Sequence, residues 1–226
     1  MAKIKFGMMM TDARGKLGGQ VFSKNRAGAY VRTKVTPVNG RTVAQMFNRN
    51  ILGSLSAGWN GLTQSQINAW NEAVSDWQKT DVFGDLKKPT GKNLYTSLNK
   101  NLLQSAQSPI TVPAEKMEIP IITATGVVVD ETASTLTLTG LASVPADVVL
   151  QIRATEAIPT GVAYIKNRLR VISNVATGAI TPATLFTAYE AKFGAVTVGQ
   201  KIGFELKYIG DNGQAGVPIT FFAVAV

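Results

Sequence analysis

The spacing of apolar residues has a period of two at the start of the chain, then a helical period, then a period of two again. Residues 14–36 are predicted to form a β-hairpin or an extended arm. Gly15, Gly18 and Gly19 oppose a helix, and Arg26-Ala27-Gly28 supplies a turn because glycine adopts positive φ without strain. Small and β-branched residues occupy one face of each expected strand, and basic and aromatic residues occupy the other. The basic and aromatic set is Phe22, Lys24, Arg26, Tyr30, Arg32 and Lys34.

Residues 42–107 have a helical period, and we expect three amphipathic helices there. The first is expected to open at a capping box, Thr42 to Gln45, and to end at Asn60-Gly61. The second opens with the same signature, Thr63 to Gln66, and Thr90 is expected to cap the third. Their apolar stripes are Met46, Phe47, Ile51, Leu55 and Trp59; Ile67, Trp70, Val74 and Trp77; and Leu94, Tyr95, Leu98 and Leu102. Facing stripes bury one another, so we interpret the tryptophans as core residues rather than as platforms for stacked bases.

The remainder of the chain is rich in β-forming residues. One helix is expected within it, with Thr181 at the N-cap, Pro182 in the first turn and Gly194 just past the end. Asp211-Asn212-Gly213 is expected to turn the chain between the last two strands. The predicted strands are Val127–Val129, Thr135–Thr139, Val148–Ala154, Tyr164–Ile172, Lys201–Ile209 and Ile219–Val226. Short strands at this spacing are typical of a small β-sandwich.

These patterns predict an α+β protein in four parts. Residues 1–41 form the N-terminal extended basic arm or β-hairpin, and residues 42–107 form a small three-helix domain. Residues 108–120 hold three prolines and no clear period, which favours a linker. Residues 121–226 form a C-terminal β-sandwich of Ig-like architecture, without the disulfide of true Ig domains because the chain has no cysteine.

The net charge of +9 resides entirely in the first fifty residues. They contain ten basic residues and one acidic residue, whereas residues 51–226 contain thirteen of each. Such an imbalance indicates a local docking device. The plain alternative is a strand pair whose charges only keep its edge soluble, and we favour docking because no nearby acidic residue balances the charge. The expected partner-binding residues are Arg14, Lys16, Phe22, Lys24, Arg26, Tyr30, Arg32, Lys34 and Arg41.

Candidate chemistry is sparse, because the chain has neither cysteine nor histidine. Thiolate nucleophiles, Cys/His zinc sites and histidine bases are therefore excluded. No two carboxylates have the spacing of a catalytic pair, and Asp211-Asn212-Gly213 lacks the other ligands of a calcium loop. Gly15–Gly19 lacks the spacing of a phosphate-binding loop. We expect no enzyme, no metal and no cofactor.

No stretch approaches the roughly 20 apolar residues of a membrane span. The apolar stretch of the first ten residues is also too short for a signal peptide. We therefore expect a soluble protein made in the cytoplasm, with no membrane partner.

Three sequence runs carry a resemblance to a known group of proteins. They are GKLGGQVFSKNRAGAYVRTKVTPVN (Gly15–Asn39) with the following Ala44-Gln45 … Arg49, LSAGWNGLTQSQINAWNEA (Leu55–Ala73), and FGDLKKPTGKNLYTSLNKNL (Phe83–Leu102). This pattern resembles small structural proteins of tailed bacteriophages, notably phages and prophages of Bacteroidota, crAss-like phages included. It covers roughly the first hundred residues, and Asn39-Gly40-Arg41 departs from the Asn-Pro-Arg expected there. The resemblance implies a virion component with an outward-facing β domain.

We therefore favour a capsid auxiliary or decoration protein, made in the host cytoplasm and located in the virion. Its basic arm would dock on the major capsid protein or other virion subunits, with Phe22 and Tyr30 as buried anchors. Many copies on a lattice, with self-association among them, would strengthen weak contacts through multivalency. One alternative is a tail or head–tail connector component. Another, ranked lower because the rest of the chain lacks further basic surface, is a nucleic-acid-binding protein that uses the same arm.

Overall fold

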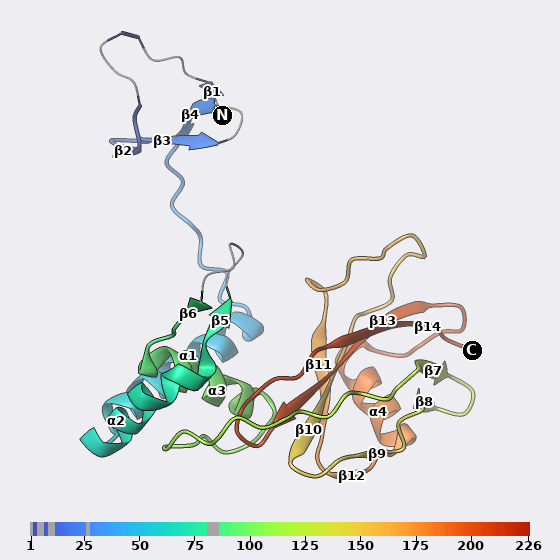
Figure 1. Ribbon diagram of the computed structural model, residues 1–226. Coiled ribbons are helices and arrows are strands. Elements are labelled where there is room, and N and C mark those ends of the chain that lie inside the picture. The colour runs from blue at the N-terminus through green and yellow to red at the C-terminus, as the bar shows by residue number, and fades with distance from the viewer. Residues whose placement is uncertain (1, 4–6, 9–11, 26–27, 81–85) are drawn as a thin grey trace. The chain divides into compact units, whose positions relative to one another are not determined.

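The computed structural model describes residues 2–3, 7–8, 12–25, 28–80 and 86–226 (Figure 1). The chain divides into two compact units, residues 1–46 and 47–226. The described residues combine helices with antiparallel sheets, which is compatible with the predicted α+β class.

The first unit is built on one small antiparallel sheet. Its strands are β1 (Ala2–Lys3), β2 (Gly15–Leu17), β3 (Gln20–Asn25) and β4 (Gly28–Thr33), in the spatial order β1-β4-β3-β2. The sequence pattern indicated the central β3–β4 pair and missed the two short strands on either side. Residues 34–42 follow without regular structure and are exposed to solvent.

Three helices begin the second unit and share one core. They are α1 (Val43–Asn60), which starts within the first unit, α2 (Gln64–Ala73) with a 3₁₀ turn (Val74–Trp77), and α3 (Gly91–Gln104). Both halves of the capping box at Thr63 are present, and the Thr90 side chain accepts a hydrogen bond from the backbone N–H of Asn93. These two caps and the predicted stripes of α2 and α3 are confirmed. The buried residues are Ile51, Leu55, Trp70, Val74, Trp77, Leu94, Tyr95 and Leu98.

The predicted stripe of α1 is only partly buried. Ile51 and Leu55 reach the core, but Met46 and Phe47 are 40% and 53% exposed. The buried residues of α1 lie in the middle of the helix, and Trp59 near its end packs on Tyr95 of α3, with ring centroids 5.4 Å apart. The start of α1 therefore carries exposed apolar residues, contrary to the prediction. A short strand pair, β5 (Lys79–Thr80) with β6 (Leu86–Lys87), lies between the 3₁₀ turn and α3.

The β region of the second unit is layered around a large apolar core. A four-stranded antiparallel sheet has the order β11-β10-β13-β14, and its inner face packs on the β7–β8 pair and on helix α4 (Figure 1). The bounds are β7 Gly126–Asp130, β8 Thr135–Thr139, β9 Ser143–Val144, β10 Val148–Ala154, β11 Arg170–Val175, β12 Gly178–Ala179, α4 Pro182–Phe193, β13 Lys201–Gly210 and β14 Ile219–Val224. The second layer is thus a strand pair plus a helix, and β9 pairs separately with β12.

Most of the predicted β elements are confirmed. Strands Thr135–Thr139 and Val148–Ala154 have the predicted bounds, and a turn occupies Asp211 to Gly213. The helix begins at Pro182 as expected, although the Thr181 side chain makes no capping hydrogen bond.

The strand predicted at Tyr164–Ile172 is wrong for most of its length. Only its last residues are extended, because the strand observed there, β11, begins at Arg170. Residues 155–169 instead form an irregular segment over the outer face of the sheet, where Ile158 and Ile165 are buried. A Cβ added at Gly203 would lie 2.6 Å from Ile165 Cδ1, so this segment packs closely on the sheet at the glycine. Ile165 is thus buried against the outer face of the sheet, and Ile158 joins the sheet through an isolated bridge to Lys201.

The expected linker, residues 108–120, is bonded to both neighbouring regions. The buried Asn99 side chain accepts from the Ile110 N–H and donates to the Ile110 carbonyl, and Trp70 Nε1 donates to Thr111. Further along, Asn212 donates to the Glu115 carbonyl. Helices and β region are also joined directly, because the Asn101 amide donates to the Gly213 carbonyl at 2.8 Å. That the helical region and the β region are separate domains stays a prediction.

Candidate docking surface

The register of the β3–β4 hairpin decides which of the expected docking residues share a face. Lys24 lies opposite Ala29, Phe22 opposite Val31, and Ser23 opposite Tyr30. Each pair joins an even-numbered residue to an odd-numbered one. Because directly opposed residues of an antiparallel pair point to the same side, even positions of β3 share a face with odd positions of β4.

This register separates the two halves of the predicted basic and aromatic set. Lys16 of β2 lies opposite Val21 of β3, and it therefore falls on the same side of the sheet as Tyr30 and Arg32. We call this side the basic face; it consists of Lys16, Val21, Ser23, Tyr30 and Arg32. The opposite side is the apolar face; it consists of Leu17, Gln20, Phe22, Lys24, Ala29, Val31 and Thr33. A single surface holding the whole set is therefore a wrong expectation, because a register one residue away would be needed to form it.

Exposure on the two faces follows residue type. Lys16, Lys24 and Arg32 are exposed, whereas Phe22 and Tyr30 are half-buried. On the apolar face Leu17 remains 72% exposed, a large apolar area for so small a sheet.

The remaining expected residues lie around this sheet. Arg14 pairs with Asp12 at 3.3 Å between Nε and Oδ2, and both side chains face solvent. Lys34 directly follows β4, where its N–H donates to the Gly19 carbonyl. Arg41 is exposed in the connecting segment with a positive φ of 43°, and Arg26 lies outside the described residues. Asp12 is the only acidic residue in the first fifty, so this unit cannot neutralise its own charge.

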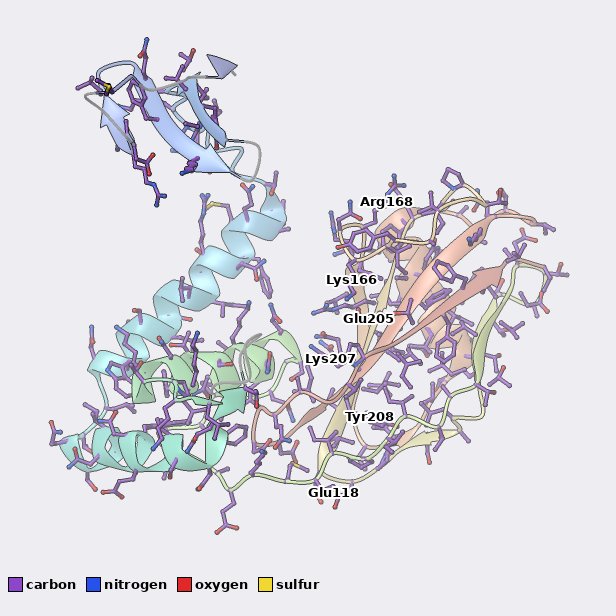
Figure 2. The ribbon with its side chains drawn as sticks, turned by 45° about the horizontal axis from the view of Figure 1, so that its top comes forward. Glu118, Lys166, Arg168, Glu205, Lys207 and Tyr208 are labelled. Atoms are coloured by element: carbon purple, nitrogen blue, oxygen red, sulfur yellow. The ribbon has the colours of Figure 1, made fainter. Side chains whose placement is uncertain are left out.

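The second unit has a charged region that sequence reasoning missed. It lies on the outer face of β10 and β13, where Arg153 and Glu205 form an ion pair at 3.1 Å with side chains 29% and 8% exposed. Lys207 lies on the same face of β13, and Lys166 and Arg168 of the preceding irregular segment gather along this side (Figure 2). The expectation that the rest of the chain lacks further basic surface is therefore wrong.

Lys207 is a half-buried base of this region. Burial lowers the pKa of Lys207 below its ordinary value of 10.5, and the positive charges of Arg153 and Lys100 lower it further, while Glu205 acts in the opposite direction. The sequence did contain an indication of this charged region, because two apolar strands carry polar residues at alternate positions. These residues are Gln151 and Arg153 on β10 and Glu205 and Lys207 on β13. Gln151 itself donates to the Gln104 carbonyl at the end of α3.

Comparisons with protein-family models, with curated proteins and with solved structures returned no match. Within the described residues, no group of three or more acidic side chains is placed to hold a metal ion. None of the helices that the structure describes is long and apolar enough to cross a membrane.

The register can be tested with an engineered disulfide, because the chain has no cysteine of its own. The bond between Lys34 N–H and the Gly19 carbonyl makes Gln20 and Thr33 a non-hydrogen-bonded pair, whose Cα atoms are typically about 4.5 Å apart. We expect Gln20→Cys with Thr33→Cys to close quantitatively in a glutathione buffer, as measured by thiol titration and mass spectrometry. Val21→Cys with Thr33→Cys is the control, and preferential closure of that pair would refute the register.

The lowered pKa of Lys207 predicts a pH-dependent stability. Below the folded-state pKa both states are protonated, so the full cost of burying the charge applies. As pH rises from that pKa to 10.5 the folded state loses its proton first, and stability increases. Lys207→Met should be more stable than the wild type at neutral pH, by a margin that shrinks toward pH 10.5 in urea denaturation. Lys166→Met, at an exposed position, should show no such margin; a pH-independent margin for Lys207→Met would contradict the account.

Proposed function

We propose that this chain is a structural protein of a virion, most simply a capsid auxiliary or decoration protein that docks through its N-terminal unit. The observation that carries the proposal is the net charge of +9 confined to the first fifty residues, with exposed cations on both faces of a small sheet. The resemblance of the first hundred or so residues to phage structural proteins supports the same role. The β region, proposed as an Ig-like sandwich, faces outward.

Docking works through the basic face. Lys16 and Arg32 pair with carboxylates of the major capsid protein, and Tyr30, two residues from Arg32 on the same face of β4, becomes fully buried as the anchor. Positive charge without internal partners speeds encounter with an acidic groove and fixes the orientation of the unit in it.

The apolar face takes a second part in docking. Phe22 and Val31 point away from the basic face and would contact an apolar wall of the receiving surface. The sheet thus suits a crevice between subunits with one acidic and one apolar wall. The exposed connector, residues 34–42, links this unit to the rest of the chain. Repetition over a lattice turns individually weak contacts into stable attachment.

A tail or head–tail connector location uses the same mechanism on another receiving surface. A nucleic-acid partner is the competing proposal, because exposed lysine and arginine with an adjacent tyrosine also suit a phosphate backbone and its bases. Binding to arbitrary DNA that collapses as salt is raised would favour it over docking on protein.

Charge reversal on the two faces tests the proposal with a matched pair of variants. Arg32→Glu and Lys24→Glu change the net charge equally, and both residues are exposed on the same hairpin. We expect Arg32→Glu to weaken binding to particles that lack this protein by about tenfold, because it places a carboxylate against the acidic wall. Lys24→Glu should weaken binding much less. Co-sedimentation over a range of protein concentrations gives both affinities.

Circular dichroism of both variants shows whether the fold is kept. Equal losses for the two variants would show that only total charge matters and that the faces are not distinguished. Unchanged binding in both would contradict docking by charge. A gel-shift series on DNA with the same proteins separates the nucleic-acid alternative.

A further inference from the structure

A pocket of about 570 Å³ opens in the second unit, between α3 and the turn that follows β13. Such a volume is within the range of sites that hold small organic molecules. Its lining comes from the 3₁₀ turn, β6, the first turns of α3, the segment before the β region, and the turn.

The charge of this pocket has one sign. Lys87, Lys88 and Lys116 line it, and no carboxylate is present among the lining residues that the structure describes. Lys88 and Lys116 are exposed, and neither forms an ion pair within the described part of the chain. The N-terminus of α3, capped by Thr90 beside Pro89, adds a partial positive charge, and its first turn holds no acidic residue.

The rest of the lining combines apolar and hydrogen-bonding groups. Trp77, Leu94 and Leu98 are at least nine-tenths buried, so they present only edges to the pocket and form its apolar floor. Gln214 accepts a hydrogen bond from the Met117 N–H through Oε1, which leaves its amide nitrogen to donate. Ser97 of α3 is exposed at the same opening. Donors therefore surround an apolar floor.

The wall opposite α3 is fixed in place. Gly213 has a φ of +80°, and a Cβ there would collide with the Leu98 carbonyl on α3. Asn101 holds the same glycine by its 2.8 Å hydrogen bond. Gln107, which follows α3, donates to the Asp211 carboxylate of the turn at 2.5 Å. Because the pocket is already formed, little conformational entropy of the protein is lost when a ligand binds.

We propose that this pocket is a binding site for an organic carboxylate with a compact apolar body. The body rests against Trp77, Leu94 and Leu98, and the carboxylate accepts hydrogen bonds from Lys88, Lys116 and the Gln214 amide. The same chemistry is supplied by a small free acid or by the C-terminal carboxylate of a polypeptide. The site is independent of the N-terminal docking surface, so either proposal can fail alone.

Phenylacetate and its neutral analogue phenylacetamide test the charge requirement on the full-length chain. In two-dimensional ¹H–¹⁵N NMR titrations, phenylacetate should shift the backbone signals of Lys88, Lys116 and Gln214 saturably. Phenylacetamide should bind about tenfold more weakly or not at all, because it lacks the charge. The peptide Gly-Gly-Phe with a free carboxylate, compared with its C-terminal amide, shows whether a chain terminus is accepted as well.

Matched alanine variants identify the groups responsible. Lys88→Ala and Lys116→Ala should each weaken phenylacetate binding severalfold, whereas Lys92→Ala, an exposed lysine of α3 outside the pocket lining, should leave it unchanged. Equal binding of acid and amide, equal effects of all three variants, or shifts confined to other parts of the protein would overturn the proposal. So would the absence of saturable shifts with both phenylacetate and the free peptide.

Discussion

Ten positive charges and one negative charge share a segment of fifty residues that cannot bury them, and this constraint governs the account of the whole molecule. In its described part the segment consists of a thin sheet, an exposed connector and the start of α1, and its only carboxylate, Asp12, pairs with Arg14. Mutual repulsion among the remaining cations opposes the compact state of this unit. An acidic surface outside the unit relieves that repulsion, so binding and stability of the sheet favour each other.

In the second unit, by contrast with the excess positive charge of the first, the buried polar groups have hydrogen-bond partners. Every buried side-chain nitrogen or oxygen that the structure describes in a non-exposed residue has a hydrogen-bond partner. Asn99 ties α3 to residue 110, and the carbonyl of Gln104 receives the side chains of Gln151 and Asn174 from the sheet. Such satisfied networks fix neighbouring elements in one arrangement. This body is therefore suited to carry a preformed pocket, whereas the first unit is suited to attach.

Sequence reasoning succeeded where one local rule determines the outcome. Thr63 and Thr90 cap their helices, and the stripe containing Trp70 is buried, because capping and helical period depend on residues close in the chain. It failed where the outcome depends on distant contacts. Ile165 covers a sheet instead of extending it, and Phe47 remains exposed although it belongs to the apolar stripe of its helix.

The candidate site shows the same limit. Alternation within β3 and within β4 is visible in the sequence, but it does not set the register between the two strands, and this register places Phe22 and Tyr30 on opposite faces. The pocket could not be foreseen either. Lys88 and Lys116 are 28 positions apart in the sequence, and α3 and the turn at Gly213 meet only in the folded chain.

Removal of the first 36 residues tests the central claim most directly. The chain of residues 37–226 is purified, its cooperative unfolding is compared with that of the full chain, and its incorporation into particles is quantified by sedimentation and gel densitometry. The account predicts that the shortened chain keeps a cooperative unfolding transition and is absent from particles. A shortened chain that enters particles in normal amounts would contradict it.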